Sequence, residues 1–174
     1  MTLVKSAVVI GLGDPLLGDR GAGPYVVEAL LQERPGLNIE LADIGLRLTD
    51  LEMHLYGRDY GILVQALARG YPGGHVSQVA YRELQRSRQS PPCLRPVLER
   101  LGLMERFGVM PPEVTFVFIE PQMVCEGVGI SKNVRYAIRK ATRLIKKDLE
   151  QRGYLCASPV VPLRYRLELL EMTV

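Results

Sequence analysis

Strand-like and helix-like segments alternate along this chain, and this alternation constrains its fold more than any other feature. A short β-branched run at residues 7–10 stops at Gly11. After a glycine-rich turn, an apolar stripe at helical spacing begins at Pro24 and ends before Pro35. Chains with this order form α/β domains, in which helices cover both faces of a mostly parallel sheet. We therefore predict such a domain, with residues 7–10 as an interior strand.

The remaining chain supplies further strand and helix signals. Short apolar runs predict strands, and a short helical piece is expected at residues 46–54. The predicted strands are residues 37–41, 60–67, a hairpin-like strand at 75–81 after a Pro-Gly-Gly turn, and 114–119. Residues 82–95 are rich in Arg, Gln, Ser and Pro without a hydrophobic period, which predicts a surface loop, either a lid over a site or a plain insertion.

A long helix is predicted after Ser131, which is well placed as its N-cap. Apolar residues recur on one side of this helix: Val134, Ala137, Ile138, Ala141 and Ile145. The other side is basic: Lys132, Arg135, Arg139, Lys140, Arg143, Lys146 and Lys147. Such a face is most simply a solvated helix surface, and it also suits an acidic partner or nucleic acid.

Beyond that helix, residues 163–169 alternate apolar and polar side chains with period two, which predicts one more strand. We therefore divide the chain into a main domain, residues 1–153, and a C-terminal extension, residues 154–174. The extra strand completes the protein's own sheet or joins the sheet of a partner.

Composition and charge exclude several classes of protein. The 174 residues are 47% hydrophobic and 24% charged, which suits one globular domain. The formal net charge of +3 is too near balance to indicate nucleic-acid binding, and no apolar stretch approaches the ~20 residues of a membrane helix. Three widely spaced cysteines without a CxxC pair argue against a disulfide framework or a zinc finger, and no signal-peptide cleavage site follows the first residues. A cytoplasmic location is expected.

The glycine-rich turn, residues 11–23, reads Gly-Leu-Gly-Asp-Pro-Leu-Leu-Gly-Asp-Arg-Gly-Ala-Gly. Glycines between a first strand and a first helix raise the question of dinucleotide binding. The GxGxxG spacing fails, because Leu16 stands at the third glycine position, and no Gly-Lys-Ser/Thr follows as in a phosphate-binding loop. No cofactor is expected on these grounds.

This turn resembles the opening motif of the nickel-iron hydrogenase maturation endopeptidases, Gly-x-Gly-Asn-x-Leu-x-x-Asp-Asp/Glu-Gly-x-Gly. The resemblance continues, in the same order, through three later segments. These are residues 39–45 (Ile-Glu-Leu-Ala-Asp-Ile-Gly), the Pro-Gly turn at 72–73, and residues 117–131 with their Glu-Pro-Gln and Gly-Val-Gly-Ile-Ser stretches. It covers about residues 5 to 150 and leaves the tail outside.

The resemblance implies a three-layer α/β/α sandwich with a twisted five-stranded sheet. It also implies recognition of a nickel-loaded hydrogenase large-subunit precursor and removal of its C-terminal extension. The family's site consists of three metal ligands: a carboxylate in the glycine-rich turn, an aspartate at the end of the central strand, and a histidine in a later loop. Such ligands suit nickel or zinc-like ions.

This chain departs from the family at all three positions. Arg20 replaces the first carboxylate, and a guanidinium has no lone pair for a metal. Gln65 stands at the strand-end position and offers only a neutral amide oxygen. The loop histidine falls at Pro92, with Cys93 beside it as the one residue that carries a ligating group. The aligned metal site is thus degenerate, and no metal is expected there.

Two uses of the altered site remain open. A metal site rebuilt from other residues would have four candidates: Asp19, Asp43, His75 and Cys93. Structural roles compete with that hypothesis: Asp19 as a cap of the first helix or a partner of Arg20, Asp43 as the holder of its turn, and His75 as a solvent-facing strand residue. Alternatively, the change from two negative charges to one positive charge favours a carboxylate guest, since arginine binds carboxylates with two parallel hydrogen bonds.

The predicted function is therefore that of a catalytically impaired maturation-protease relative. It would bind a hydrogenase large subunit or related metalloprotein as an assembly factor, without nucleic acid or a membrane span. The expected partner cleft contains Asp14, Asp19, Asp43 and Gly45. The alternatives are an active metal-dependent endopeptidase with a rebuilt site, and a structural subunit of a larger complex. Catalysis by the Cys93 thiol is disfavoured, because no Cys-His-Asn arrangement is legible around it.

Overall fold

A five-stranded sheet forms the middle of the molecule, as shown by a computed structural model that describes residues 5–33, 36, 38–87, 91–127 and 129–154. Its strands are β1 (Ala7–Leu12), β2 (Ile39–Gly45), β3 (Tyr60–Ala66), β4 (Val76–Ala80) and β5 (Glu113–Ile119), in the spatial order β2-β1-β3-β5-β4. All neighbours are parallel except β4, which runs antiparallel to β5. The predicted mostly parallel α/β sheet is confirmed.

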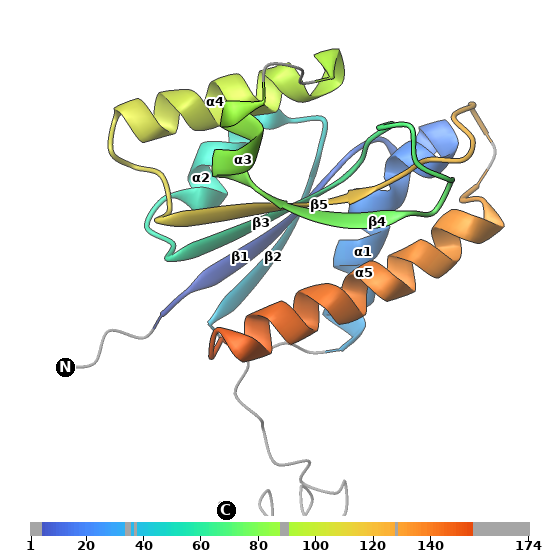
Figure 1. Ribbon diagram of the computed structural model, residues 1–174. Coiled ribbons are helices and arrows are strands. Elements are labelled where there is room, and N and C mark those ends of the chain that lie inside the picture. Colours follow the sequence, from blue (N-terminus) through green and yellow to red (C-terminus); the bar gives the residue numbers. More distant parts are fainter. Residues whose placement is uncertain (1–4, 34–35, 37, 88–90, 128, 155–174) are drawn as a thin grey trace, which may run out of the picture.

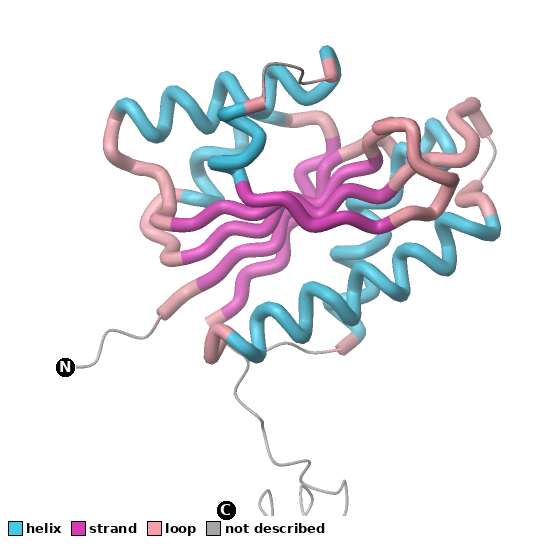
Figure 2. Tube along the Cα trace, in the orientation of Figure 1, coloured by secondary structure: helices cyan, strands magenta, loops and turns pink. Residues whose placement is uncertain are grey.

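Helices cover both faces of the sheet (Figures 1 and 2). One face carries α1 (Ala22–Gln32) and α5 (Lys132–Gln151), and the other carries α2 (Leu51–Leu55), α3 (Tyr81–Arg86) and α4 (Arg95–Arg106). Short 3₁₀ turns precede several helices: η1 (Pro15–Gly21), η2 (Leu48–Asp50) and η3 (Pro92–Leu94). The three-layer sandwich is confirmed, and none of the described helices is both long and apolar enough to cross a membrane.

Burial on both faces explains why β1 and the first five residues of β3 are apolar. Successive side chains of a strand alternate between the two faces, so Val9 and Ile62 enter the core under α1 and α5, while Val8 and Leu63 enter the core under α2 and α4. All six residues of β1 are buried. The strand is interior, as predicted.

The long final helix also agrees with its prediction. Ser131 caps it, with its Oγ accepting a hydrogen bond from the backbone N–H of Val134. All five residues of the predicted apolar face are buried. The predicted strand at residues 163–169 and most of the proposed extension lie outside the described residues.

Three sequence predictions need correction. Residues 82–95 are not simply a loop, because α3 begins at Tyr81 and η3 leads into α4, a helix the sequence analysis did not anticipate. Only Tyr81 and Leu84 of α3 are buried, too few to produce a visible period. The strand predicted at 37–41 continues through Gly45, because an edge strand accommodates the exposed side chain of Asp43. Finally, β4 does not form a hairpin with β3, because β5 lies between them.

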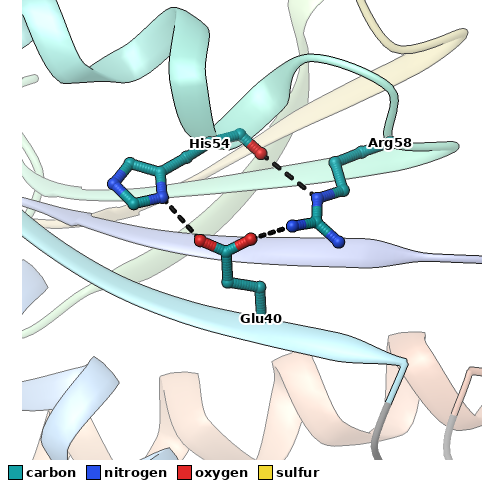
Figure 3. A network of polar contacts seen from close by, with 3 residues as sticks. All are labelled: Glu40, His54 and Arg58. Carbon is teal, nitrogen blue, oxygen red and sulfur yellow. Dashed lines mark hydrogen bonds and ion pairs between the residues drawn. The ribbon is translucent and has the colours of Figure 1, made fainter.

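A polar network fastens α2 to the edge strand β2 (Figure 3). Glu40 of β2 lies with Oε1 2.6 Å from His54 Nδ1 and accepts a hydrogen bond from Arg58, whose Nε in turn donates to the His54 carbonyl. All three side chains are partly buried, and the Glu40 carboxylate contacts both partners. Glu40 sits near the start of its strand, away from the carboxyl edge, so we assign this cluster a structural role.

A tyrosine buried under α5 is expected to control stability at alkaline pH. The Tyr60 hydroxyl donates to Asp148 Oδ2 at 2.6 Å, and burial, followed by this hydrogen bond, raises the pKa of Tyr60 above its usual value. Because the folded-state pKa exceeds the unfolded value of about 10, its contribution to stability is complete below pH ~10 and is lost as the pH rises further.

Comparing Tyr60→Phe with the wild type by urea unfolding from neutral to alkaline pH tests this expectation. The free energy of unfolding of the variant should be about 1 kcal/mol lower near pH 7, because the hydrogen bond is missing. Above pH ~10 it should fall less steeply than that of the wild type. Tyr136→Phe, at a ring that is 67% exposed, serves as the surface control. Identical alkaline slopes for Tyr60→Phe and the wild type would contradict the assignment.

Candidate functional site

The candidate site lies where β1, β2, β3 and β5 end, because the carboxyl ends of parallel strands gather at one edge of the sheet. The glycine-rich turn crosses this edge between β1 and α1. Gly13 has φ of 136°, and a Cβ built there would lie 1.9 Å from the Arg20 carbonyl oxygen. The turn therefore folds its own backbone onto the end of β1, which explains the glycine without a bound nucleotide.

Asp19 is the anchor of this edge. Its side chain is fully buried, and its carboxylate accepts hydrogen bonds from the backbone N–H groups of Gln122 and Met123 at 2.8 Å each. It also accepts from the Ser131 N–H at 2.7 Å and the Ser131 hydroxyl at 2.9 Å. Asp19 thus ties η1 to the loop after β5 and to the start of α5, where a negative charge is favoured.

The structural roles suggested for Asp19 from the sequence are therefore wrong. Neither a cap of α1 nor a bond to Arg20 is formed, because the N-cap of α1 is Gly21 and the carboxylate oxygens face Gln122, Met123 and Ser131. A buried carboxylate that accepts four hydrogen bonds has a structural role. These donors come from the loop after β5 and from the residue that caps α5.

The other expected cleft residues hold the turn geometry. Asp14 caps η1, with Oδ1 accepting from the Leu16 N–H at 2.9 Å. Asp43 accepts from the Gly45 N–H at 3.0 Å, as expected for a turn holder. The Gly45 carbonyl accepts from the Gly13 N–H at 3.0 Å. These residues join the ends of β1 and β2, and Asp14 also lines a hollow of about 470 Å³ with Glu126, Gly127 and Gly129.

Glu120 is a second buried carboxylate that the sequence analysis did not single out. It is 6% exposed, and its oxygens accept from the backbone N–H groups of Arg69 and Gly70 at 2.9–3.0 Å. It lies directly after β5, so it holds the loop that follows β3. An acidic residue directly after the apolar run at residues 116–119 was the available signal.

Arg20 and Gln65 come to the same place from different elements. The backbone of Arg20 lies against Gly13, directly after β1, and Gln65 of β3 is the register partner of Leu12, the last residue of β1. The Arg20 side chain is exposed and forms no ion pair with any described residue. Gln65 Oε1 is buried without a hydrogen-bond partner, the one such side-chain atom in the described part of the chain.

Cys93 and His75 are both exposed. Cys93 is an exposed free thiol in η3, at the start of α4. His75 is exposed and stacks on Tyr71, with ring centroids 4.5 Å apart. Across residues 5–33, 36, 38–87, 91–127 and 129–154, no three His, Cys, Asp or Glu side chains are grouped to hold a metal ion.

Solved structures provide the comparison. The hydrogenase maturating endopeptidase HybD from Escherichia coli is 22% identical, covers 85% of this chain and 94% of its own, and superposes with a TM-score of 0.77. A hydrogenase 2 maturation peptidase from a Thaumarchaeota archaeon is 26% identical, with coverages of 86% and 99% and a TM-score of 0.63. The [NiFe] hydrogenase maturation protease HybD from Thermococcus kodakarensis is 21% identical, with coverages of 82% and 97% and a TM-score of 0.66.

This chain has the hydrogenase maturation endopeptidase fold. No family model and no curated protein matches its sequence. The resemblance read from the four ordered sequence segments is nevertheless confirmed, because the superpositions extend over nearly the whole of each solved endopeptidase.

The metal that the hydrogenase maturation endopeptidase resemblance implies does not fit the residues present. At the aligned positions this endopeptidase-like chain offers a cation, a neutral amide oxygen and an exposed thiol or proline. Asp19, which precedes Arg20 in the sequence, already accepts four hydrogen bonds. A guanidinium repels a divalent ion and cannot ligate it, so we assign no chemical step at this edge to a metal ion.

Proposed function

We propose that this chain binds a metalloenzyme precursor, a nickel-iron hydrogenase large subunit or a relative, as an assembly factor in the cytoplasm, and does not cleave it. The observation that carries the proposal is the pairing of a maturation-endopeptidase fold with Arg20 and Gln65 at the positions where the family resemblance implies carboxylates. A fold transfers more safely than an activity when the reacting groups differ.

The chemistry of the edge favours a carboxylate-bearing peptide. Arg20 is exposed and offers its guanidinium without competition from a described acidic side chain. Gln65, at the end of β3, is neutral and adds no negative charge at this edge. A chain terminus or an acidic side chain of the partner supplies a carboxylate for the Arg20 guanidinium.

Exposed apolar side chains at the same edge support a protein partner. They lie on the segments that follow β1, β2 and β5: Leu16 at 77% exposure, Leu46 at 70%, Met123 at 40% and Val124 at 51%. Apolar side chains that surround a polar centre are typical of protein-binding surfaces. We infer that the recognition surface of the endopeptidase fold is retained while its hydrolytic site is lost.

The test mixes the purified protein with a nickel-loaded, extension-bearing large-subunit precursor, followed by intact mass measurement and size exclusion. We expect unchanged masses and co-elution. A precursor shortened at its C-terminus overturns the absence of cleavage and favours an active endopeptidase with a rebuilt site. Unchanged masses without co-elution overturn binding to this precursor.

The role of Arg20 is tested in the same assay. Arg20→Glu should weaken association at least about tenfold, because the substitution places a negative charge where the carboxylate of the partner would bind. Arg86→Glu, at an exposed position in α3, is the matched control and should leave affinity unchanged. Equal affinities for Arg20→Glu and the wild type would remove the electrostatic part of the proposal.

A further inference from the structure

A groove runs between α1 and α5 on the face of these helices that points away from the sheet. Two adjoining hollows of about 450 and 480 Å³ form it, and they share Ala29, Gln32 and Arg139. Ile130 and Ile138 complete an apolar floor with Ala29. The two helices form one layer against the sheet (Figure 1), whereas Arg20 belongs to η1 and Gln65 to the end of β3.

One wall of the groove is a row of arginines. Arg135, Arg139 and Arg143 are exposed, line the hollows and recur at four-residue intervals, which places them about 6 Å apart along α5. None of the three forms an ion pair with a described acidic side chain, although Arg135 donates to the Ile130 carbonyl at 3.4 Å. The row is thus available to carboxylates from outside.

The acidic side chains of the opposite wall do not neutralise this row. Glu33, the C-cap of α1, is already paired with Lys146, and Glu28 is the one acidic residue within α1. Between Lys132 and Lys147, α5 contains seven basic residues and no acidic one. The groove therefore carries a local excess of positive charge over an apolar floor.

We propose that this groove binds an acidic amphipathic helix of a partner protein. A third helix packs naturally into the furrow between two others, and glutamates at i, i+4 and i+8 match the interval of the arginine row. The apolar floor favours a peptide over nucleic acid, because a phosphate backbone brings no apolar side chain to Ala29 or Ile130. This inference goes beyond the proposed function and does not depend on it.

The test uses a fluorescein-labelled synthetic helix of about 18 residues, with glutamates at four-residue intervals beside a leucine stripe, and measures anisotropy at about 0.15 M salt. The same peptide with glutamine for glutamate and a labelled DNA duplex are the comparison probes. We expect saturable binding of the acidic peptide, weakened at least about fivefold by Arg139→Glu. The adjacent Lys140→Glu makes the same charge change outside the groove and should have little effect.

Several outcomes overturn the proposal. An equal loss of affinity for the acidic peptide with Arg139→Glu and Lys140→Glu would mean nonspecific charge attraction. Equal affinity for the glutamine peptide would show that the arginines do not recognise carboxylates. Preferential binding of the duplex would make the surface a nucleic-acid site, and absence of saturable peptide binding would reject the groove. Thermal melting of both variants, whose substituted side chains are exposed, verifies that they remain folded.

Discussion

Replacing Asp19 by asparagine is expected to lower the free energy of unfolding by about 3 kcal/mol or more. The carboxylate accepts three backbone N–H groups and one hydroxyl inside a fully buried site. An amide keeps one oxygen and turns its NH₂ group toward donors, so at least one buried N–H loses its acceptor. Urea unfolding measures the change.

Asp14→Asn is the matched control for this prediction. Asp14 lies in the same turn, but its described hydrogen bond is a single one, to the Leu16 N–H near the surface, so its loss should be about 1 kcal/mol or less. Equal losses for the two variants would contradict the anchoring role of Asp19. Arg20 follows Asp19 directly, and we therefore expect Asp19→Asn also to weaken association with the precursor.

Gly23→Ala is the second substitution with a large expected effect, a loss of about 3 kcal/mol. Gly23 lies in the first turn of α1, where a Cβ would stand 2.3 Å from the Leu12 carbonyl oxygen and 2.4 Å from the Val64 carbonyl oxygen. Both are backbone atoms of interior strands and cannot yield without moving the sheet. This clash outweighs the roughly 1 kcal/mol by which alanine exceeds glycine in helix propensity.

Gly129→Ala makes the same chemical change where a Cβ would meet no atom within 4 Å. Its free energy of unfolding should stay within about 0.5 kcal/mol of the wild type. Urea unfolding of both variants separates the close approach of α1 to the sheet from the general cost of replacing a glycine. A wild-type stability for Gly23→Ala would show that α1 can shift away from β1 and β3.

The fold was largely predictable, because burial on both faces leaves a strong local signal. β1 is a continuous apolar run, β3 and β5 are mostly apolar, and the apolar face of α5 recurs at helical spacing over the whole helix. The weaker elements were missed where burial involves few side chains. Two buried residues hold α3 in place, and α4 buries Val97, Leu101 and Met104 beside charged neighbours.

The candidate site was predictable only in part. The departures at Arg20, Gln65 and Cys93 are visible in the sequence, since a resemblance in ordered motifs identifies the positions. The sequence does not reveal that Gln65 Oε1 lacks a hydrogen-bond partner, because this depends on the neighbouring strands β1 and β5. The groove between α1 and α5 likewise depends on which helices become neighbours, although the basic face of α5 was apparent.

The sequence by itself determined the α/β class, the family resemblance and the absence of carboxylates at two aligned positions, since these follow from residue type and local period. Tertiary structure alone decided the role of Asp19, whose donors lie more than 100 positions away along the chain. The same side chain was compatible from sequence with a metal ligand, a helix cap or an ion pair. Hydrogen bonds between distant segments leave no periodic trace, and only folding brings Gln122, Met123 and Ser131 around one carboxylate.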